Sequence, residues 1–294
     1  MTKLMDTLQE TFFKLPEKSL RDLVWAVSSP ALLDTSWSPA QPLWLDELLL
    51  QAGPWQHWQL PAESPHSRLG LVFEQLWQSW LQEQHIALAA NLQIASTERT
   101  LGELDLLLKL PQQPLHLELA MKFYLGHNDE WIGPNRRDLL ANKIAHTRDH
   151  QLPLAHTEAA HTAMAGLGFS NTDALRSEAL MRGCLFHPVD TNIKAALPLE
   201  VNPHHWRGWW CHAHQLADQV SRGDWIILAK DQWLSPALSP VKASADELVS
   251  LVVRHFDWLK VPLSIARVER TEFGWAEVER AMVVSDQWPQ AFPK

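Results

Sequence analysis

Hydrophobic residues along the chain follow two periods, and each change of period marks the boundary of a predicted element. In residues 67–84 apolar side chains recur every three or four positions, as on one face of an amphipathic helix. In residues 116–126 the pattern alternates, so Glu118, Ala120 and Lys122 share one face of a strand and apolar residues occupy the other. The predicted order is helix, three strands, helix and strand, over residues 67–84, 85–95, 102–110, 116–126, 133–152 and 179–189.

The segments on either side of this order have weaker patterns. Residues 3–27 are helical apart from a break at a proline, and residues 28–66 have the Ser, Pro and Trp content of a surface connection. Other expected elements are loops at 153–175 and 204–210, helices near 43–51, 211–221 and 244–257, and strands near 223–229, 262–269 and 279–284. We expect a helical N-terminal extension (1–66), an α/β core (67–190) and a C-terminal extension (191–294). The last should pack on the core, because its apolar segments are too short for an independent sheet.

Composition narrows the class of protein. Apolar residues make up 46% and charged residues 20% of the 294, an ordinary balance for a globular chain. The net charge of −9 argues against coating nucleic acid through bulk electrostatics, although it is compatible with a local basic groove. Two cysteines do not suggest a disulfide framework, the N-terminus lacks the apolar core of a signal peptide, and no apolar run has membrane-spanning length. We therefore expect a cytoplasmic protein without a membrane partner.

The tetrapeptide PQQP between two predicted strands brings charged side chains together. A turn centred between its glutamines pairs residues whose numbers sum to 225, so that Asp105 faces Ala120 and Glu103 faces Lys122. Glu118 lies one step along the same face as Ala120. The hairpin therefore predicts that Asp105, Glu118 and Lys122 converge, and a slip of one residue would separate them.

Carboxylates on adjacent strands suit a hard divalent cation, since Mg²⁺ takes oxygen ligands and often binds one or two carboxylates with water and phosphate. Asp105 and Glu118 are the candidate pair, and Lys122 would orient or deprotonate a water or stabilise charge on phosphate. The structural alternative is a pair between Glu103 and Lys122 with a solvated Asp105, which would contribute about 0.2–1 kcal/mol.

The order of elements and the acidic residues together resemble the PD-(D/E)XK nuclease superfamily. The core of that superfamily runs αβββαβ, with an aspartate on the second strand and a (D/E)xK pattern on the third. Here GELDLLL supplies Asp105, HLELAMK supplies Glu118, and RLGLVFEQLW supplies Glu74 on the first helix. The resemblance implies a restriction-endonuclease-like fold in which these three acids hold Mg²⁺ or Mn²⁺. This sequence departs from the (D/E)xK pattern at Ala120, which occupies the usual lysine position. Lys122 lies about 7 Å further along the same face.

At a finer level the chain resembles a bacterial family catalogued as domain of unknown function 1853. The similarity is carried by GELDLLL, LELAMKFYLG, W-I-G-P-N-x-x-D, K-x-x-H, HQLPL, the W-L-S-P loop and VVSDQWP, which together extend over most of the chain. That family brings no function with it, so an activity has to be inferred from the site.

A basic stripe is predicted on the helix at 133–152, which Asn135 would cap. At about 100° per residue, Arg136, Lys143 and His150 are seven positions apart and stay on one side of the helix. Apolar neighbours favour a stripe that faces the sheet or a cleft, where it would contact phosphate. The alternative is that the lysine and arginine stems cover apolar surface while their charges reach water.

The sequence thus predicts an α/β protein with a restriction-endonuclease-like αβββαβ core and helical N-terminal and mixed C-terminal additions. The favoured function is a Mg²⁺- or Mn²⁺-dependent phosphodiesterase acting on nucleic acid, with DNA preferred to RNA. One alternative is an inactive scaffold of the same fold that binds nucleic acid or a protein partner, which Ala120 favours. Another is a structural domain whose sixteen tryptophans hold an assembly partner. The substrate and the oligomeric state stay open.

Overall fold

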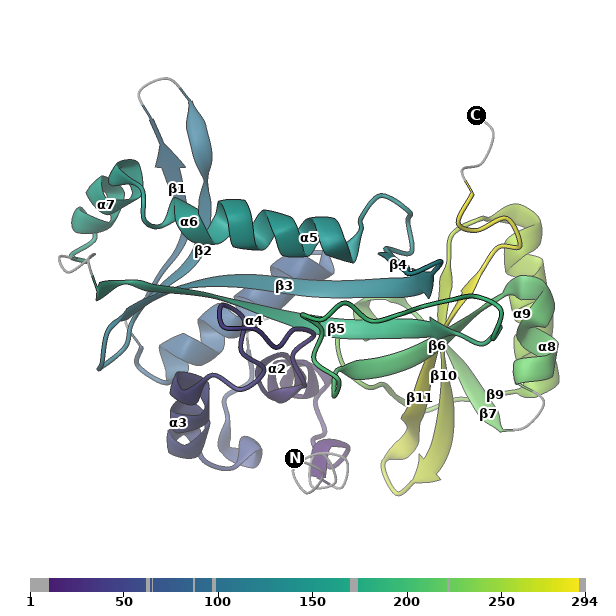
Figure 1. Cartoon of the computed structure of the whole chain (residues 1–294). Helices are drawn as coiled ribbons and strands as arrows, with labels where there is room; N and C mark the ends of the chain where they lie inside the picture. Colours follow the sequence, from purple (N-terminus) through teal and green to yellow (C-terminus); the bar gives the residue numbers. More distant parts are fainter. Residues whose placement is uncertain are drawn as a thin grey trace.

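The protein is a mixed α/β structure built around one large sheet, as shown by a computed structural model (Figure 1). The structure describes residues 11–61, 64, 66–86, 88–96, 99–169, 174–220 and 223–290. The helices are α2 (Lys18–Ser28), α3 (Leu43–Ala52), α4 (Leu69–Glu83), α5 (Leu140–His146), α6 (Leu152–Leu154), α7 (Glu158–Ala165), α8 (Leu216–Gln219) and α9 (Ala245–Trp258). Shorter helical turns are η1 (Trp55–His57), the π-helical η2 (Thr147–Gln151), η4 (Ala213–Gln215) and η5 (Lys230–Gln232).

The strands form an eleven-stranded sheet in the described part of the chain, ordered β1-β2-β3-β5-β6-β11-β10-β7-β9, with β4 beside β3 and β8 beside β11. They are β1 (Leu88–Ala95), β2 (Thr100–Lys109), β3 (Pro114–His127), β4 (Glu130–Ile132), β5 (Arg176–Pro188), β6 (Trp206–His212), β7 (Asp224–Leu228), β8 (Leu238–Ser239), β9 (Ala243–Ser244), β10 (Leu263–Thr271) and β11 (Gly274–Val284). β5 is parallel to β3 and β6, and β6 is parallel to β11. The C-terminal strands therefore continue the sheet that the first half of the chain begins.

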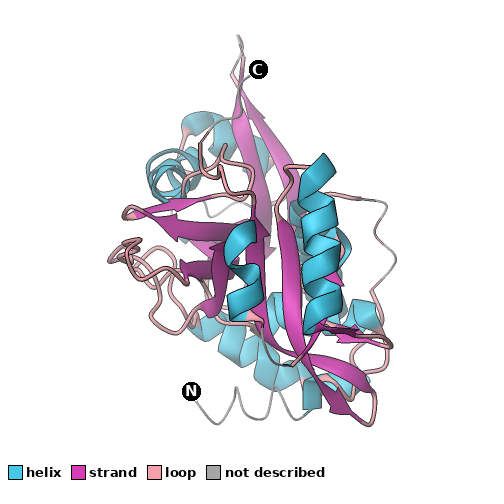
Figure 2. Ribbon diagram, turned by 90° about the vertical axis from the view of Figure 1, so that its right-hand side faces the viewer, coloured by secondary structure: helices cyan, strands magenta, loops and turns pink. Residues whose placement is uncertain are grey.

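Helices cover both faces of this sheet (Figure 2). The buried face of α4 joins α2 and the odd-numbered β3 residues, such as Leu117 and Leu119, in one apolar cluster. α5 packs on the other face, where Leu140 and Ile144 share a cluster with Tyr124 of β3. Since successive strand residues point to opposite faces, β3 presents its apolar odd positions to α4 and its polar even positions to the α5 side.

Elements that depend on local periodicity are confirmed. The helix expected at 67–84 is α4, and the strands expected at 85–95, 102–110 and 116–126 are β1, β2 and β3, with ends shifted by a few residues. The predicted order helix, three strands, helix and strand is present as α4, β1, β2, β3, α5 and β5, with β4, α6 and α7 as additions.

Other local expectations are wrong. The expected loop at 153–175 contains α7, which Thr157 caps by accepting a hydrogen bond from the N–H of Ala160. The Trp-rich segment at 204–210 was expected as a loop but leads into β6, a strand inside the sheet. The helix expected near 211–221 is reduced to η4 and α8, because β6 occupies its first residues.

The register of β2 against β3 differs from the expected one by two positions. Observed partners, such as Leu107 and His116, have numbers that sum to 223. The strands are joined by residues 110–113, so the centre of the connection lies one residue earlier than expected. A shift of two positions leaves every side chain on its original face, and Asp105 and Glu118 stay on the same side of the sheet.

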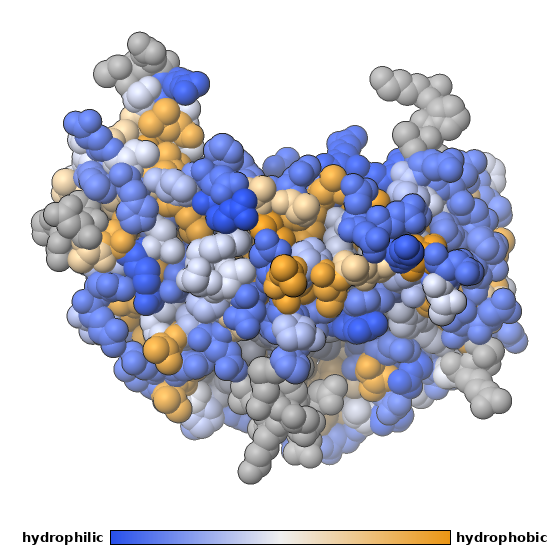
Figure 3. Space-filling model, viewed as in Figure 1, coloured by the Kyte–Doolittle hydropathy of each residue, from blue (hydrophilic) through white to orange (hydrophobic). Residues whose placement is uncertain are grey.

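Most of the large aromatic side chains are inside the molecule. Trp77, Trp80, Trp210 and Trp225 are among the largest fully buried side chains, whereas Trp258 is 87% exposed. The face seen in Figure 3 is mainly hydrophilic, with hydrophobic residues in separate groups. Within the described residues, no helix combines the length and the apolar character needed to cross a membrane.

Leu106→Ala should destabilise the fold by about 2–5 kcal/mol, because the fully buried Leu106 lies where β2 last pairs with β3 and its truncation leaves a cavity. Leu101→Ala is the matched control on the same strand. Leu101 is 39% exposed, so its truncation should change the free energy of unfolding by less than about 1 kcal/mol. Urea unfolding measures both variants, and equal losses would contradict the burial of Leu106.

Candidate active site

The candidate site lies where two paired strands separate. β2 and β3 are paired over four residues each, ending at Leu106 and Leu117. Beyond this point β2 continues beside β1, and β3 continues beside β5. At the separation, the backbone N–H of Leu119 donates a hydrogen bond of 2.9 Å to Oδ2 of Asp105. A side chain thus replaces a ladder carbonyl as the acceptor and fixes the Asp105 carboxylate against β3.

Two carboxylates lie at this separation, Asp105 of β2 and Glu118 of β3, and Glu74 of α4 is near enough to affect the pKa of Asp105. Burial, together with the charge of Glu118, raises the pKa of Asp105 to about 7. Burial also raises the pKa of Glu74, and the charges of Glu103 and Glu118 add to the effect. α4 packs on the face opposite to α5, so Glu74 approaches the other acids from the far side of the sheet. The three predicted metal ligands are within electrostatic range of one another.

Lys143 of α5 supplies positive charge to this cluster. It opposes the effect of the neighbouring carboxylates on the pKa of Asp105 and of Glu74. Burial and the charge of Lys122 lower the pKa of Lys143 itself. A partly buried ammonium with a lowered pKa gives up a proton more readily than a surface lysine does.

Gln151 connects Lys143 to Glu118. Its Oε1 accepts hydrogen bonds from Nζ of Lys143 at 2.7 Å and from the Thr147 hydroxyl at 2.8 Å. Its Nε2 donates to Oε2 of Glu118, while Oε1 of Glu118 is 2.9 Å from Nε2 of His116. Both oxygens of the Glu118 carboxylate are therefore held by neighbouring side chains.

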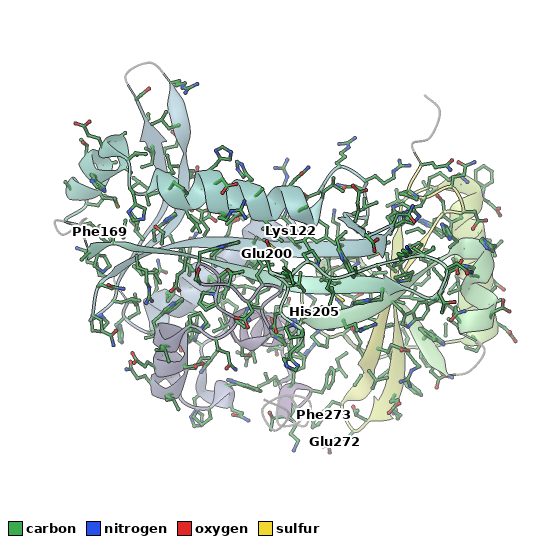
Figure 4. All side chains as sticks on the ribbon, viewed as in Figure 1. Lys122, Phe169, Glu200, His205, Glu272 and Phe273 are labelled. Carbon is green, nitrogen blue, oxygen red and sulfur yellow. The ribbon has the colours of Figure 1, made fainter. Side chains whose placement is uncertain are left out.

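Lys122 has a different partner from the one expected. It lies on β3 near α5 (Figure 4), and its Nζ is 2.5 Å from Oδ2 of Asp138. The Tyr124 hydroxyl donates to the same oxygen at 3.1 Å. Glu103 does not pair with Lys122, because β2 and β3 have already separated at this level, and it accepts a hydrogen bond of 3.0 Å from Asn91 instead.

Arg136 does not belong to the basic stripe. Residues 133–138 form a turn in which Arg136 has a left-handed φ of 63°, so α5 begins only at Leu140. Asn135 therefore does not cap the helix. The Arg136 side chain donates to the backbone carbonyl of Gln290 near the C-terminus.

A π-helical turn also removes His150 from the stripe. η2 winds fewer degrees per residue than an α-helix, because its hydrogen bonds span one residue more. The face of the helix that carries Lys143 therefore continues through Thr147 and Gln151. His150 is exposed beside His146, with ring centroids 5.4 Å apart.

Sequence reasoning missed His116, Thr147 and Gln151. His116 had a signal, since it lies two residues before Glu118 and so on the same face of the strand. Gln151 had none, because its position depends on the π-helical turn.

The metal-binding potential of the site rests on a pair of carboxylates. Within the described ranges, no group of three or more His, Cys, Asp and Glu side chains is arranged to hold a metal ion. Asp105 and Glu118 repel each other, and a divalent cation between them would relieve this repulsion. Mg²⁺ commonly binds one or two carboxylates and keeps several waters. The donor set therefore fits Mg²⁺ or Mn²⁺ at Asp105 and Glu118, with Glu74 acting from further away.

Asp105→Asn should make the metal-free protein more stable at about pH 8. The pKa of Asp105 rises from its ordinary value of 3.8 to about 7 on folding, so between these values the native state binds more protons than the unfolded state. The contribution of Asp105 to stability therefore falls as the pH rises through this range, and its full penalty applies above about pH 7. The amide keeps an acceptor for Leu119 and removes the charge, which should stabilise the fold by about 1–3 kcal/mol at pH 8.

Urea unfolding of wild type and Asp105→Asn at about pH 4.5 and pH 8 measures this difference. The advantage of the variant should shrink at the lower pH, where the wild-type carboxyl is protonated in the fold. A variant that is less stable than wild type at pH 8 would show that the ionised carboxylate stabilises the structure.

Comparison with known proteins places the chain in a family. No curated protein and no solved structure matches it. The model of the family described as Domain of unknown function (DUF1853) matches residues 21–284, which include the whole sheet and the acidic site. The chain belongs to this DUF1853 family.

Proposed function

We propose that the protein is a divalent-metal-dependent phosphodiesterase that acts on nucleic acid. The observation that carries the proposal is the meeting of Asp105 and Glu118 where β2 leaves β3, with the pKa of Asp105 raised to about 7. A strongly perturbed carboxyl beside a specific charged partner is typical of a functional site. The order of elements and the positions of Glu74, Asp105 and Glu118 support the PD-(D/E)XK resemblance, and with it a restriction-endonuclease-like core.

Asp105 and Glu118 hold Mg²⁺ or Mn²⁺ in this proposal, and Glu74 orients a water at the edge of the site. The bound cation would supply a Lewis acid for a phosphate oxygen and lower the pKa of a water. The hydrogen bonds from His116 and Gln151 leave lone pairs on both oxygens of Glu118, because a carboxylate has about four acceptor positions. These bonds therefore orient Glu118 while its oxygens stay able to coordinate.

Lys143, and not Lys122, is the catalytic lysine in this proposal. Lys143 affects the pKa of Asp105 and Glu74 directly, whereas the ammonium of Lys122 is paired with Asp138. Ala120, at the usual lysine position of the (D/E)xK pattern, packs against the cluster that α5 shares with β3, so no lysine of β3 occupies that position. A lysine from the helix would then stabilise the charge that develops on phosphate.

Nucleic acid is the proposed substrate, with DNA preferred to RNA, and this part of the proposal is supported by the resemblance. With a net charge of −9, phosphate contacts would be local and would involve Lys143. Of the other predicted phosphate contacts, Arg136 and His150 lie away from the acids and are not part of the proposal.

The second candidate function is an inactive scaffold of the same fold that binds nucleic acid or a protein partner. The pairing of Lys122 with Asp138 favours it, since the lysine of β3 is then structural. The hydrogen bonds to both oxygens of Glu118 also satisfy this group without a cation. The two candidates differ in whether the protein binds metal.

Millimolar Mn²⁺ or Mg²⁺ should raise the melting temperature of the wild type. A ligand that binds only the native state, at a concentration 100 times its Kd, adds about 2.7 kcal/mol to the free energy of unfolding. For a chain of this size, this corresponds to a rise in melting temperature of several degrees. Asp105→Asn and Glu118→Gln should abolish the shift and the metal-dependent cleavage of single- and double-stranded DNA and RNA.

Glu103→Gln is the matched control for this experiment. Glu103 is exposed, lies on the same strand two residues before Asp105, and bonds to Asn91. Its variant should keep the metal-dependent shift. A wild type that melts at the same temperature with and without metal would support the scaffold.

Lys143→Met should lower cleavage by about 100-fold or more, because it removes the ammonium that stabilises the transition state. Lys122→Met removes only a partly exposed ion pair with Asp138 and should cost less than about 10-fold in rate and about 1 kcal/mol in stability. Single-turnover cleavage rates of the two variants decide between the lysines. A larger loss in Lys122→Met would return the catalytic role to the lysine of β3.

A further inference from the structure

Three hydrogen bonds connect an exposed histidine to the buried Glu118. Nε2 of His156 lies 2.9 Å from Oγ of Ser177, and this hydroxyl lies 3.2 Å from Nδ1 of His116. Nε2 of His116 lies 2.9 Å from Oε1 of Glu118. His116 is 0% exposed and Glu118 is 2% exposed, so the two inner groups of this series are buried.

The parallel pairing of β3 with β5 sets up this arrangement. His116 is the register partner of Ser177, and Glu118 is the partner of Ala179. His116 and Glu118 are two residues apart on one strand and point to the same face. His156 follows α6, and its Nε2 contacts the hydroxyl of Ser177.

The chemistry of the groups determines which one donates and which one accepts in each of the three hydrogen bonds. An ionised carboxylate only accepts hydrogen bonds, so the tautomer that suits this contact carries its proton on Nε2 of His116 and has Nδ1 as an acceptor. Ser177 then donates its single hydroxyl proton to Nδ1, and its oxygen accepts the N–H of His156. Every donor therefore points inwards, towards Glu118.

We propose that His116 is a positioning residue for Glu118, and that Ser177 and His156 fix the orientation of its ring. His116 holds one oxygen of the carboxylate while Gln151 holds the other, so the terminal torsion of Glu118, which is otherwise broad, is restricted. This inference rests on the proposed function, because the held carboxylate is one of the two metal ligands. Partners that orient a metal ligand typically change metal affinity by about 10–100-fold when they are removed.

Two substitutions of His116 separate positioning from packing. The amide nitrogen of His116→Gln extends as far as Nε2 and keeps a donor for Glu118, whereas that of His116→Asn corresponds to Nδ1 and loses this donor. Ser177→Ala removes the hydroxyl that orients the ring and leaves the strand intact. His204→Asn, at an exposed histidine before β6, is the unrelated control.

Calorimetric titration of the full chain with Mn²⁺, together with melting curves of the metal-free variants, tests the inference. His116→Asn and Ser177→Ala should weaken Mn²⁺ binding by about 10–100-fold, while His116→Gln and His204→Asn stay within about 5-fold of the wild type. Ser177→Ala should melt within about 2 °C of the wild type, since one partly exposed hydroxyl contributes little to stability.

The outcomes distinguish this inference from the proposed function. A wild type that binds no Mn²⁺ would overturn the proposed function and the role of His116 with it. A wild type that binds Mn²⁺, with His116→Asn and Ser177→Ala binding equally tightly, would overturn the inference alone. Equal losses in His116→Gln and His116→Asn, with unchanged affinity in Ser177→Ala, would assign His116 a packing role and contradict the proposal.

Discussion

The hydrogen bond from the backbone of Leu119 to the carboxylate of Asp105 marks the constraint on which the site depends. At this point β3 loses β2 from one edge, because β2 continues beside β1. β5 stays paired on the other edge of β3. A strand that loses a neighbour exposes backbone groups, and Asp105 satisfies one of them. The same separation lets side chains from α4 and α5, on opposite faces of the sheet, reach one group of carboxylates.

The electrostatics of this group follow from its place in the sheet. Burial of Asp105, and after it the charge of Glu118 on the neighbouring strand, raise the pKa of Asp105 to about 7. Lys143 compensates part of the charge, and His116 and Gln151 hold Glu118. The arrangement suits the binding of a divalent cation. Hydrogen bonds orient the acids, and the charge of Lys143 compensates only part of their negative charge.

The sequence was sufficient for features that depend on local spacing. The apolar repeat of α4 and the alternation in β3 gave the helix, the strand and the face of Glu118. The hairpin register was wrong by two positions, and the error was harmless to the site because an even shift preserves the faces. The basic residues were less predictable. Arg136 and His150 were placed by a uniform helical repeat, which a turn before α5 and the π-helical η2 both interrupt. The partner of Lys122 is Asp138, a contact across sixteen residues that no periodicity indicates.

The description of the DUF1853 family names no function, so the proposed function depends on whether Asp105 and Glu118 form a divalent-metal site. The most direct measurement is anomalous diffraction from crystals of the full chain soaked in Mn²⁺. We predict an anomalous peak bonded to carboxylate oxygens of both Asp105 and Glu118, with waters completing the coordination and Lys143 still bound to Gln151. Crystals with no peak at these carboxylates at millimolar Mn²⁺, and with Glu118 still held by His116 and Gln151, would contradict the account.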